Sequence, residues 1–169
     1  MIDITKMQFI HYGNTKLEPI RISKLDNSYL NKPNIGLWAS PIGEEYYTWK
    51  EWCESEDFRK CDDDNSFKFH LSDKANILII DHPDVLLQLK QRQLLINKPG
   101  SSLNVVLDYD KIISNKLYDG VLLIHGDYYN VFHCGYILNN TYNNRHIDFN
   151  SWDCDSIVIW NTNIIKEDK

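Results

Sequence analysis

The sequence predicts an α+β protein, built on a mainly antiparallel, split mixed sheet with flanking helices. Runs of β-branched and aromatic residues recur along the chain and are bounded by glycine, proline or asparagine, as strands commonly are. The amphipathic helical segments are too few and too irregularly placed for a repeating βαβ series. With 169 residues, of which 43% are hydrophobic and 25% charged, the chain is long enough to bury a core of its own. We therefore expect a single domain that spans residues 1–169.

The first elements are expected to be extended. Met7–Tyr12 predicts a strand that ends at Gly13, the first residue of a Gly-Asn turn pair. Leu17–Ile22 predicts a second short extended piece. Gly36–Ser40 predicts a short buried strand, which Pro41 ends because proline has no backbone N–H for the ladder.

A helix is expected after this strand. Glu44–Phe58 has helical character, and Glu44 and Glu45 would lie in its first turn, where the helix dipole favours negative charge. The following segment, Arg59–Ser66, is acidic and predicts a solvated loop. Its aspartates do not have the alternating spacing, central glycine and terminal glutamate of an EF-hand, so the sequence does not support a calcium site there.

The middle of the chain mixes both element types. Phe67–Leu71 and Asn76–Ile80 predict strands, and Tyr118–Ile124 predicts a third. Asp84–Leu95 predicts an amphipathic helix and Asp108–Leu117 a shorter one.

The last part of the chain is less regular. Asp127–Asn150 is rich in Tyr, Asn and His and predicts irregular structure. Asp155–Trp160 predicts a final strand, followed by a charged tail at Lys166–Lys169. The longest apolar runs, Ala75–Ile80 and Gly120–Ile124, are too short to span a bilayer, so no membrane segment is expected.

Charge and cysteine content restrict the classes of function. A formal net charge of −6 argues against general binding to nucleic acid or to an anionic membrane, because both need a basic surface. The cysteines form no Cys-x-x-Cys pair, and no signal peptide indicates an oxidising compartment. We therefore expect a cytoplasmic protein in which four thiols are free: Cys53, Cys61, Cys134 and Cys154.

Two tryptophans suggest a binding site. Trp38 on the predicted strand and Trp49 on the predicted helix are eleven positions apart and would face each other where Pro41 ends the strand. Two π faces with a gap between them suit a flat, electron-poor ring. The alternative is that both side chains belong to the ordinary core, where tryptophan is common.

Three groups of residues form an ordered pattern. They are His11 with Gly13, Gly36-Leu37-Trp38 with Trp49, and Asp155 ahead of Ser156-Ile157-Val158-Ile159. In this order they resemble the ADP-ribosyltransferase family, in its diphtheria-toxin and poly(ADP-ribose) polymerase branch. That branch has a histidine before a glycine on the first strand and a Gly-aliphatic-Tyr strand with a second tyrosine eleven positions later. An acidic residue then opens a late strand.

The resemblance implies an ADP-ribosyltransferase-like fold with NAD as its substrate. Trp38 and Trp49 would hold the cationic nicotinamide, and His11 would bond an adenosine-ribose hydroxyl as a neutral imidazole. The absence of a basic cluster near His11 in the sequence favours NAD over NADP. The implied NAD-binding residues are His11, Gly13, Gly36, Trp38, Ser40 and Trp49.

Two carboxylates would complete the site. The resemblance implies that Asp155 stabilises the oxocarbenium-like ribose and holds its 2′-hydroxyl. It implies that Asp153 contacts the acceptor, with Trp152 and Phe149 as exposed aromatic contacts; the alternative is that Asp153 is only a turn residue. The negative charge of the chain favours a protein acceptor over nucleic acid, and such an activity would suit a toxin or an effector of phage–host conflict.

The departures from the family pattern leave a second function open. The sequence has His-Tyr-Gly in place of His-Gly, tryptophans in place of both tyrosines, and Asp155 in place of glutamate. Aspartate is one methylene shorter, and a misplacement of about 1 Å can cost about 100-fold in rate. The alternative is therefore a catalytically lapsed transferase fold that acts as a protein-binding inhibitor.

No metal site is expected. Two loose sets of thiol and imidazole side chains occur, but neither contains the short ligand pairs that zinc sites use. They are His125, His133, Cys134, His146 and Cys154 in one set, and Cys53, Cys61, His70 and His82 in the other.

Overall fold

A seven-stranded sheet organises the protein. The computed structural model describes residues 2–20, 25, 31–98, 100, 104–137 and 146–168. The strands of the main sheet are β1 (Gln8–Tyr12), β2 (Leu37–Pro41), β3 (Ser66–Leu71), β4 (Ile77–Ile80), β7 (Gly120–Leu123), β10 (Ser156–Ile159) and β11 (Ile165–Glu167). Two small sheets pair β5 (Leu95–Asn97) with β6 (Val105–Leu107), and β8 (Tyr136–Ile137) with β9 (His146–Ile147).

The described residues contain four α-helices and four 3₁₀ turns. The α-helices are α1 (Trp49–Ser55), α2 (Pro83–Gln91), α3 (Tyr109–Ser114) and α4 (Tyr129–Cys134). The 3₁₀ turns are η1 (Ile4–Lys6), η2 (Asp63–Asn65), η3 (Gly126–Tyr128) and η4 (Thr162–Ile164). Within the described part of the chain, no helix combines the length and the apolar character needed to cross a bilayer.

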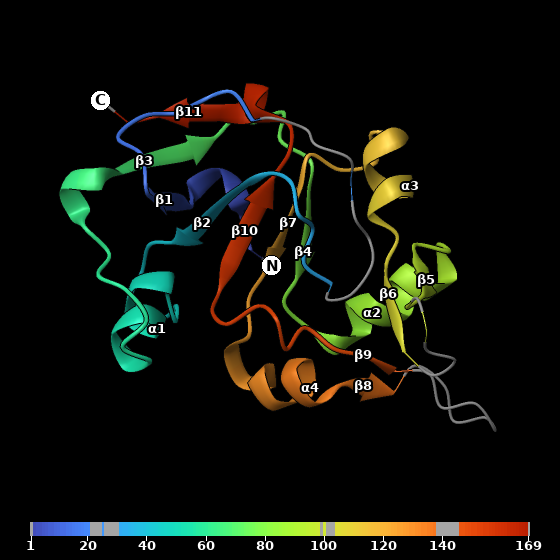
Figure 1. The fold of residues 1–169 in the computed structure, drawn as a ribbon. Helices are drawn as coiled ribbons and strands as arrows, with labels where there is room; N and C mark the ends of the chain where they lie inside the picture. The colour runs from blue at the N-terminus through green and yellow to red at the C-terminus, as the bar shows by residue number, and fades with distance from the viewer. Residues whose placement is uncertain are drawn as a thin grey trace.

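The strand order confirms the α+β prediction with a mixed, mostly antiparallel sheet. The order is β11-β3-β1-β2-β10-β7-β4, and only the β4–β7 pair is parallel. In Figure 1, β11, β3 and β2 run from side to side, whereas β10, β7 and β4 run roughly from top to bottom, so the sheet is strongly curled. The last long strand, β10, lies in the middle of this sheet between β2 and β7.

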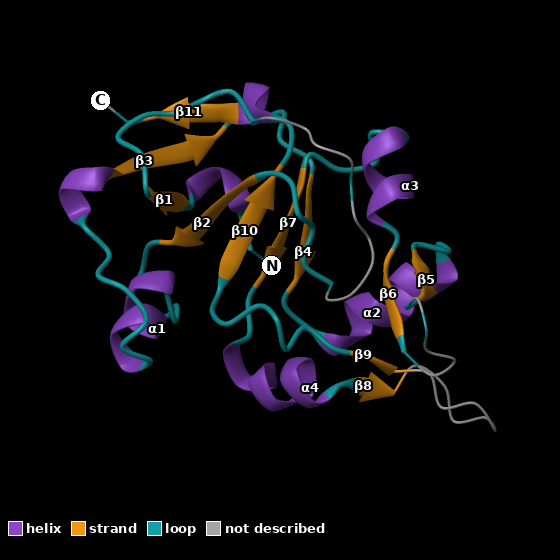
Figure 2. Cartoon of the chain, in the orientation of Figure 1, coloured by secondary structure: helices purple, strands orange, loops and turns teal. Residues whose placement is uncertain are grey.

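The core lies on both faces of the curled sheet. On one face, α2, α3 and α4 contribute Leu86, Ile112 and Phe132 to a cluster that also contains Val158 of β10 (Figure 2). On the other face, Ile157 of β10 belongs to a second cluster, formed mainly by β1, β2 and β3. Because successive strand residues point to opposite faces, β10 is buried on both sides.

The helix after β2 begins later than the sequence suggests. It starts at Trp49 rather than Glu44, because Thr48 and Glu51 form a capping box at its N-terminus. The Thr48 side chain accepts a bond from the Glu51 backbone N–H, and the Glu51 carboxylate accepts one from the Thr48 N–H. The expected start at Glu44 is wrong because these two residues satisfy the free donors of the first turn.

Other differences concern short elements. The expectation of irregular structure at Asp127–Asn150 is wrong for α4, β8 and β9, and residues 138–145 of that segment lie outside the described part of the chain. The first two residues of the charged tail, Lys166 and Glu167, belong to β11, which pairs with β3. Residues 17–20 form no strand, and residues 21 and 22 lie outside the described part of the chain. Tertiary pairing decides such short strands, and local composition carries little of that information.

Candidate functional site

A cavity of about 190 Å³ lies where β1, β2, the N-terminus of α1 and the start of β10 meet. These segments are distant in sequence, and the sheet brings them together because β2 pairs with β1 on one side and β10 on the other. The lining combines aromatic rings with a few charged or polar groups, as ligand sites commonly do. It consists of Ile10, His11, Tyr12, Lys32, Trp38, Ala39, Ser40, Trp49, Arg59, Trp152, Asp153, Cys154 and Ser156.

His11 is held at the end of β1. Its Nδ1 donates a hydrogen bond of 2.7 Å to the backbone carbonyl of Trp38, and its ring contacts Phe67 with centroids 5.4 Å apart. With the proton on Nδ1, a neutral ring keeps Nε2 as an acceptor. Gly13 is close to this nitrogen, since a Cβ on it would lie 3.8 Å from His11 Nε2, but it is outside the cavity lining.

Trp38 forms one wall of the cavity. Its ring packs edge-on against Trp152, with centroids 4.7 Å apart. The Lys32 ammonium lies 5.3 Å from the Trp38 ring centroid and 3.5 Å from a carboxylate oxygen of Asp153. It also donates a bond of 2.9 Å to the Ser151 carbonyl. The cavity therefore has a lysine and a carboxylate beside an aromatic face.

Trp49 also lines the cavity, and its position is fixed by a bond to β2. The Trp49 backbone N–H donates a 2.9 Å bond to the hydroxyl of Ser40, which is buried. The ring stacks on Trp52 with centroids 4.8 Å apart, and the Arg59 guanidinium lies 5.4 Å from its centroid. Part of the Trp49 π surface is thus already used by groups of the chain.

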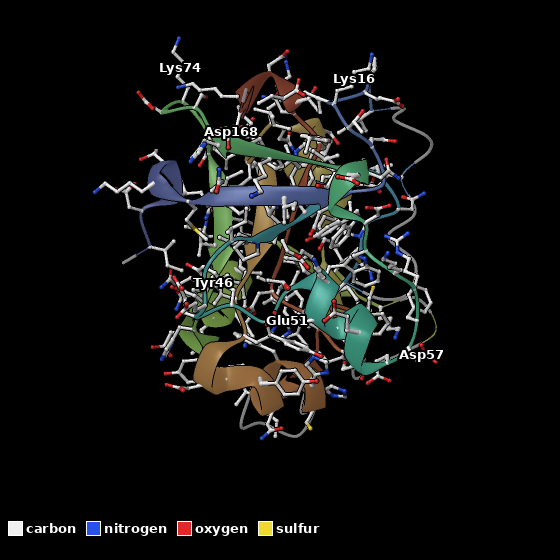
Figure 3. All side chains as sticks on the ribbon, turned by 90° about the vertical axis from the view of Figure 1, so that its left-hand side faces the viewer. Lys16, Tyr46, Glu51, Asp57, Lys74 and Asp168 are labelled. Atoms are coloured by element: carbon white, nitrogen blue, oxygen red, sulfur yellow. The ribbon has the colours of Figure 1, made fainter. Side chains whose placement is uncertain are left out.

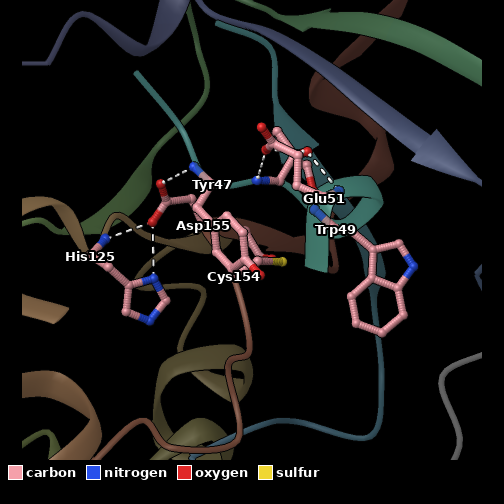
Figure 4. Close-up of polar contacts among 9 residues, drawn as sticks. Tyr47, Trp49, Glu51, His125, Cys154 and Asp155 are labelled. Carbon is pink, nitrogen blue, oxygen red and sulfur yellow. Dashed lines mark hydrogen bonds and ion pairs between the residues drawn. The ribbon is translucent and has the colours of Figure 1, made fainter. Parts of the chain in front are cut away.

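Asp155 has different surroundings. One carboxylate oxygen accepts bonds of 2.7 Å from the His125 backbone N–H and 2.9 Å from His125 Nδ1, and the other accepts a 3.0 Å bond from the Tyr47 N–H. The Asp155 N–H in turn donates 2.8 Å to the Tyr47 carbonyl. Figure 4 shows the carboxylate turned towards Tyr47 and His125. Its side chain is only 3% exposed, and it is outside the cavity lining.

Asp155 lies between two residues of the cavity lining, immediately before β10 begins at Ser156. Cys154 and Ser156 line the cavity, and the intervening Asp155 points to the other side. The Cys154 sulfur lies 3.2 Å from the Ser156 hydroxyl oxygen. Burial raises the pKa of the Cys154 thiol to about 12, so this cysteine is a protonated thiol at neutral pH and a poor nucleophile.

Several predicted site residues have structural roles. Trp152 and Phe149 are 1% and 0% exposed, so the expectation that they are exposed contacts is wrong; both belong to the core cluster of the helical face. Gly36 is outside the cavity lining. A Cβ on it would lie 2.7 Å from a methyl group of Val158, and its φ is +108°. Gly36 therefore permits close packing of the chain before β2 against β10.

Two cations of the cavity were not predicted. Lys32 and Arg59 come from segments without regular secondary structure, and neither is close to His11 in sequence. Their proximity to the aromatic walls is a result of tertiary structure. Both cations line the same cavity as His11. The preference for NAD over NADP, which rested on the absence of a basic cluster near His11 in the sequence, stays a prediction.

Metal ligation has no support from the geometry. Among the described residues, no three His, Cys, Asp or Glu side chains are arranged to hold an ion. Within the first predicted set, the rings of His125 and His133 are 5.2 Å apart, and His125 is bonded to Asp155. All four cysteines are free.

The site thus defines an α+β protein with an aromatic cavity that contains a carboxylate and two cations. No family model matches the chain, and comparison with curated proteins and with solved structures found no match. The chemistry of the cavity therefore carries the interpretation.

Proposed function

We propose that the protein is an NAD-dependent ADP-ribosyltransferase that moves ADP-ribose from NAD to a macromolecular acceptor. The observation that carries the proposal is the cavity lining: His11, Trp38, Trp49 and Asp153 surround one space. A planar cationic ring needs aromatic faces, and its cleavage from ribose needs a carboxylate nearby. The cavity offers both groups.

The cavity suits the nicotinamide-ribose half of NAD. Its volume of about 190 Å³ is below the range of about 300–1,000 Å³ of pockets that enclose whole drug-sized ligands. The adenosine half would therefore extend out of it, with a ribose hydroxyl donating to His11 Nε2. Lys32 and Arg59 supply positive charge for the diphosphate. Each aromatic contact with the cationic ring is worth about 0.5–2 kcal/mol.

The reaction requires a negative charge close to the breaking bond. When the bond between nicotinamide and ribose breaks, its electron pair leaves with the nicotinamide nitrogen and C1′ of the ribose becomes electron-poor. A nucleophile of the acceptor then forms a bond to C1′ and loses its proton to solvent. A carboxylate that faces the cavity stabilises this cationic state.

Asp153 is better placed than Asp155 to supply this charge. Asp153 lines the cavity, and its side chain is 29% exposed, with Lys32 as its cationic neighbour. Asp155 already accepts three hydrogen bonds inside the protein. We therefore assign charge stabilisation to Asp153. We assign to Asp155 the positioning of Tyr47 and, two residues later, of Trp49.

The test is a titration of the purified protein with NAD, followed by tryptophan fluorescence and by release of nicotinamide. Stacking on Trp38 or Trp49 should quench the fluorescence, and Trp38→Ala should remove most of that quench. Trp160→Phe is the matched control, because Trp160 lies outside the cavity lining and bonds to the Tyr118 carbonyl. No quench at millimolar NAD and no nicotinamide release would contradict the proposal.

A second candidate function is a protein-binding module derived from a lapsed transferase. The observation that favours it is that both oxygens of the Asp155 carboxylate already accept hydrogen bonds from groups of the protein. In that case NAD would neither bind nor be cleaved, whereas the surface around α1 would still bind a protein. The same titration separates the two candidates.

A further inference from the structure

An exposed aromatic patch continues outward from the cavity. Trp49 lines the cavity and stacks on Trp52, and Phe58 contacts both rings, with centroid distances of 5.9 Å to Trp49 and 5.3 Å to Trp52. Phe58 is 60% exposed, the largest value for a big apolar side chain among the described residues. We call Trp52 and Phe58, with the residues around them from 51 to 64, the α1 surface.

The α1 surface has a net negative charge almost as large as that of the whole protein. Residues 51–64 contain seven acidic and two basic side chains, a net −5 of the −6 of the whole chain. All seven acids are exposed, and Figure 3 shows Glu51 and Asp57 among them on the outside of the molecule. Among these seven acidic residues, only Asp63 forms an ion pair in the described structure, with its carboxylate 2.8 Å from the Lys50 ammonium. The patch is therefore apolar at its centre and acidic around it.

The patch already binds one cation of the chain itself. The Arg59 guanidinium lies over the Trp49 ring, at 5.4 Å from its centroid. Guanidinium groups bind well to aromatic faces, and nearby carboxylates add a Coulombic attraction. A groove of about 600 Å³ adjoins the same helix, and its charged lining consists of Glu51, Glu54 and Asp63 together with Lys50 and Lys68. An extended chain has room to lie along it.

We propose that the α1 surface docks an arginine- or lysine-rich segment of a partner protein. If the proposed transferase function holds, this partner is the acceptor, because Arg59 belongs both to the α1 surface and to the cavity lining, and Trp49 of the lining stacks on Trp52. The carboxylates complement a basic chain, and the Phe58 ring offers it a cation–π contact. A nucleic acid would meet like charge on this surface.

The first experiment measures binding of a synthetic Arg- and Gly-containing peptide by calorimetry, without NAD. We expect binding that weakens as salt rises, because the attraction is partly between exposed charges. Phe58→Ala should weaken it about 2- to 30-fold, the range for one cation–π contact. Ile137→Ala is the matched control, since Ile137 is 53% exposed but outside the α1 surface, and it should leave binding unchanged.

A second set of variants tests the charge. Glu54→Lys combined with Glu56→Lys should weaken peptide binding about tenfold at low salt. Asp73→Lys makes the same kind of change in the turn before β4, next to Lys74, which Figure 3 shows far from Asp57, and it should have little effect. Equal binding of an acidic peptide, tighter binding of a single-stranded oligonucleotide, or unchanged affinity in all these variants would overturn the proposal.

The two proposals fail in different ways. NAD binding is measured by fluorescence without peptide, and peptide binding is measured without NAD. Phe58→Ala and the Glu54→Lys, Glu56→Lys pair lie outside the cavity lining, so NAD binding should survive in both. Peptide binding without NAD binding would leave the docking surface in place and remove the transferase.

Discussion

Asp153 and Asp155 are two residues apart at the start of β10, and their surroundings differ in every respect that matters for chemistry. The Asp153 side chain is 29% exposed, faces the cavity and has Lys32 3.5 Å away. The Asp155 side chain is 3% exposed and accepts three bonds from His125 and Tyr47. The same residue type thus supplies a charge to the cavity at one position and a structural anchor at the other. Orientation decides between the two roles.

The largest expected effect is on stability, at Asp155. Asp155→Ala leaves the two N–H groups of His125 and the N–H of Tyr47 without their acceptor in the interior. Each buried donor without a partner costs about 1–3 kcal/mol, so we expect a loss of about 4 kcal/mol in the free energy of unfolding. Urea denaturation measures it. The matched change, Asp153→Ala, should alter the free energy of unfolding by no more than about 0.5 kcal/mol. Equal losses in both variants would contradict the comparison.

The second prediction concerns the rate of NAD cleavage. Here the larger effect is expected at Asp153, whereas the larger effect on stability is expected at Asp155. Asp153→Asn should lower NAD cleavage about 100–1000-fold, by analogy with the loss of one group that stabilises transition-state charge. Folding and NAD binding should survive, because the amide keeps the size of the side chain. Release of nicotinamide measures the rate. A rate loss of this size in Asp155→Asn, with unchanged stability and with Asp153→Asn fully active, would make Asp155 the catalytic carboxylate.

A smaller effect is expected at Ser40, which holds Trp49 from the side of β2. Ser40→Ala removes the acceptor of the Trp49 N–H bond and should cost about 1 kcal/mol of stability. If Trp49 positions the nicotinamide, KM for NAD should rise more than kcat falls. Ser156→Ala is the control, since Ser156 also lines the cavity but bonds to Cys154. An unchanged KM in Ser40→Ala would show that Trp49 does not position the ring.

The smallest expected effect is a pH dependence of the free energy of unfolding. It arises at His133, whose ring contacts His125, the hydrogen-bond partner of Asp155. Burial, and next the charge of His125, lower the pKa of His133 from about 6.5. The unfolded chain therefore takes up a proton at this residue more readily than the folded protein. Stability contributed by neutral His133 should be lost as the pH falls below about 6.5. Urea midpoints one pH unit above and below that value measure it, and His133→Gln should flatten the difference. A steeper loss in the variant would contradict this assignment.

The sequence predicted the strands of the site better than the orientation of its charges. Met7–Tyr12, Gly36–Ser40 and Asp155–Trp160 are rich in apolar residues and bounded by turn residues, and each corresponds to a strand of the sheet. Strand alternation would place Asp153 and Asp155 on the same side, because they are two residues apart. Only Asp153 lines the cavity, since both residues precede β10 and the chain there does not have regular strand geometry. The path of this segment is fixed by tertiary contacts, such as the bonds of Asp155 to His125 and Tyr47, which no local pattern indicates.

The cavity side chains that come from loops could not be predicted from the sequence, because tertiary structure also decides their positions. Lys32 and Arg59 reach the cavity through the paths of segments without regular structure, and no local pattern marks them. Trp152 was expected at the surface because the family resemblance implied that it contacts the acceptor beside Asp153. In the structure it is buried, and its indole N–H donates to the carbonyl of Asn31. A large aromatic ring finds its place through tertiary packing, and its sequence neighbours say little about it.

The central place of β10 has a consequence for biosynthesis. The strand lies between β2 and β7, yet both neighbours are synthesised long before it. Until residues 156–159 leave the ribosome, β2 and β7 each present an open edge, and open edges invite pairing with other chains. A chain that stops before β10 would also lack the lining residue Ser156 and the partner strand that positions Trp38. Nascent chains are therefore exposed to misassembly until β10 has been synthesised, and the cavity is completed only then.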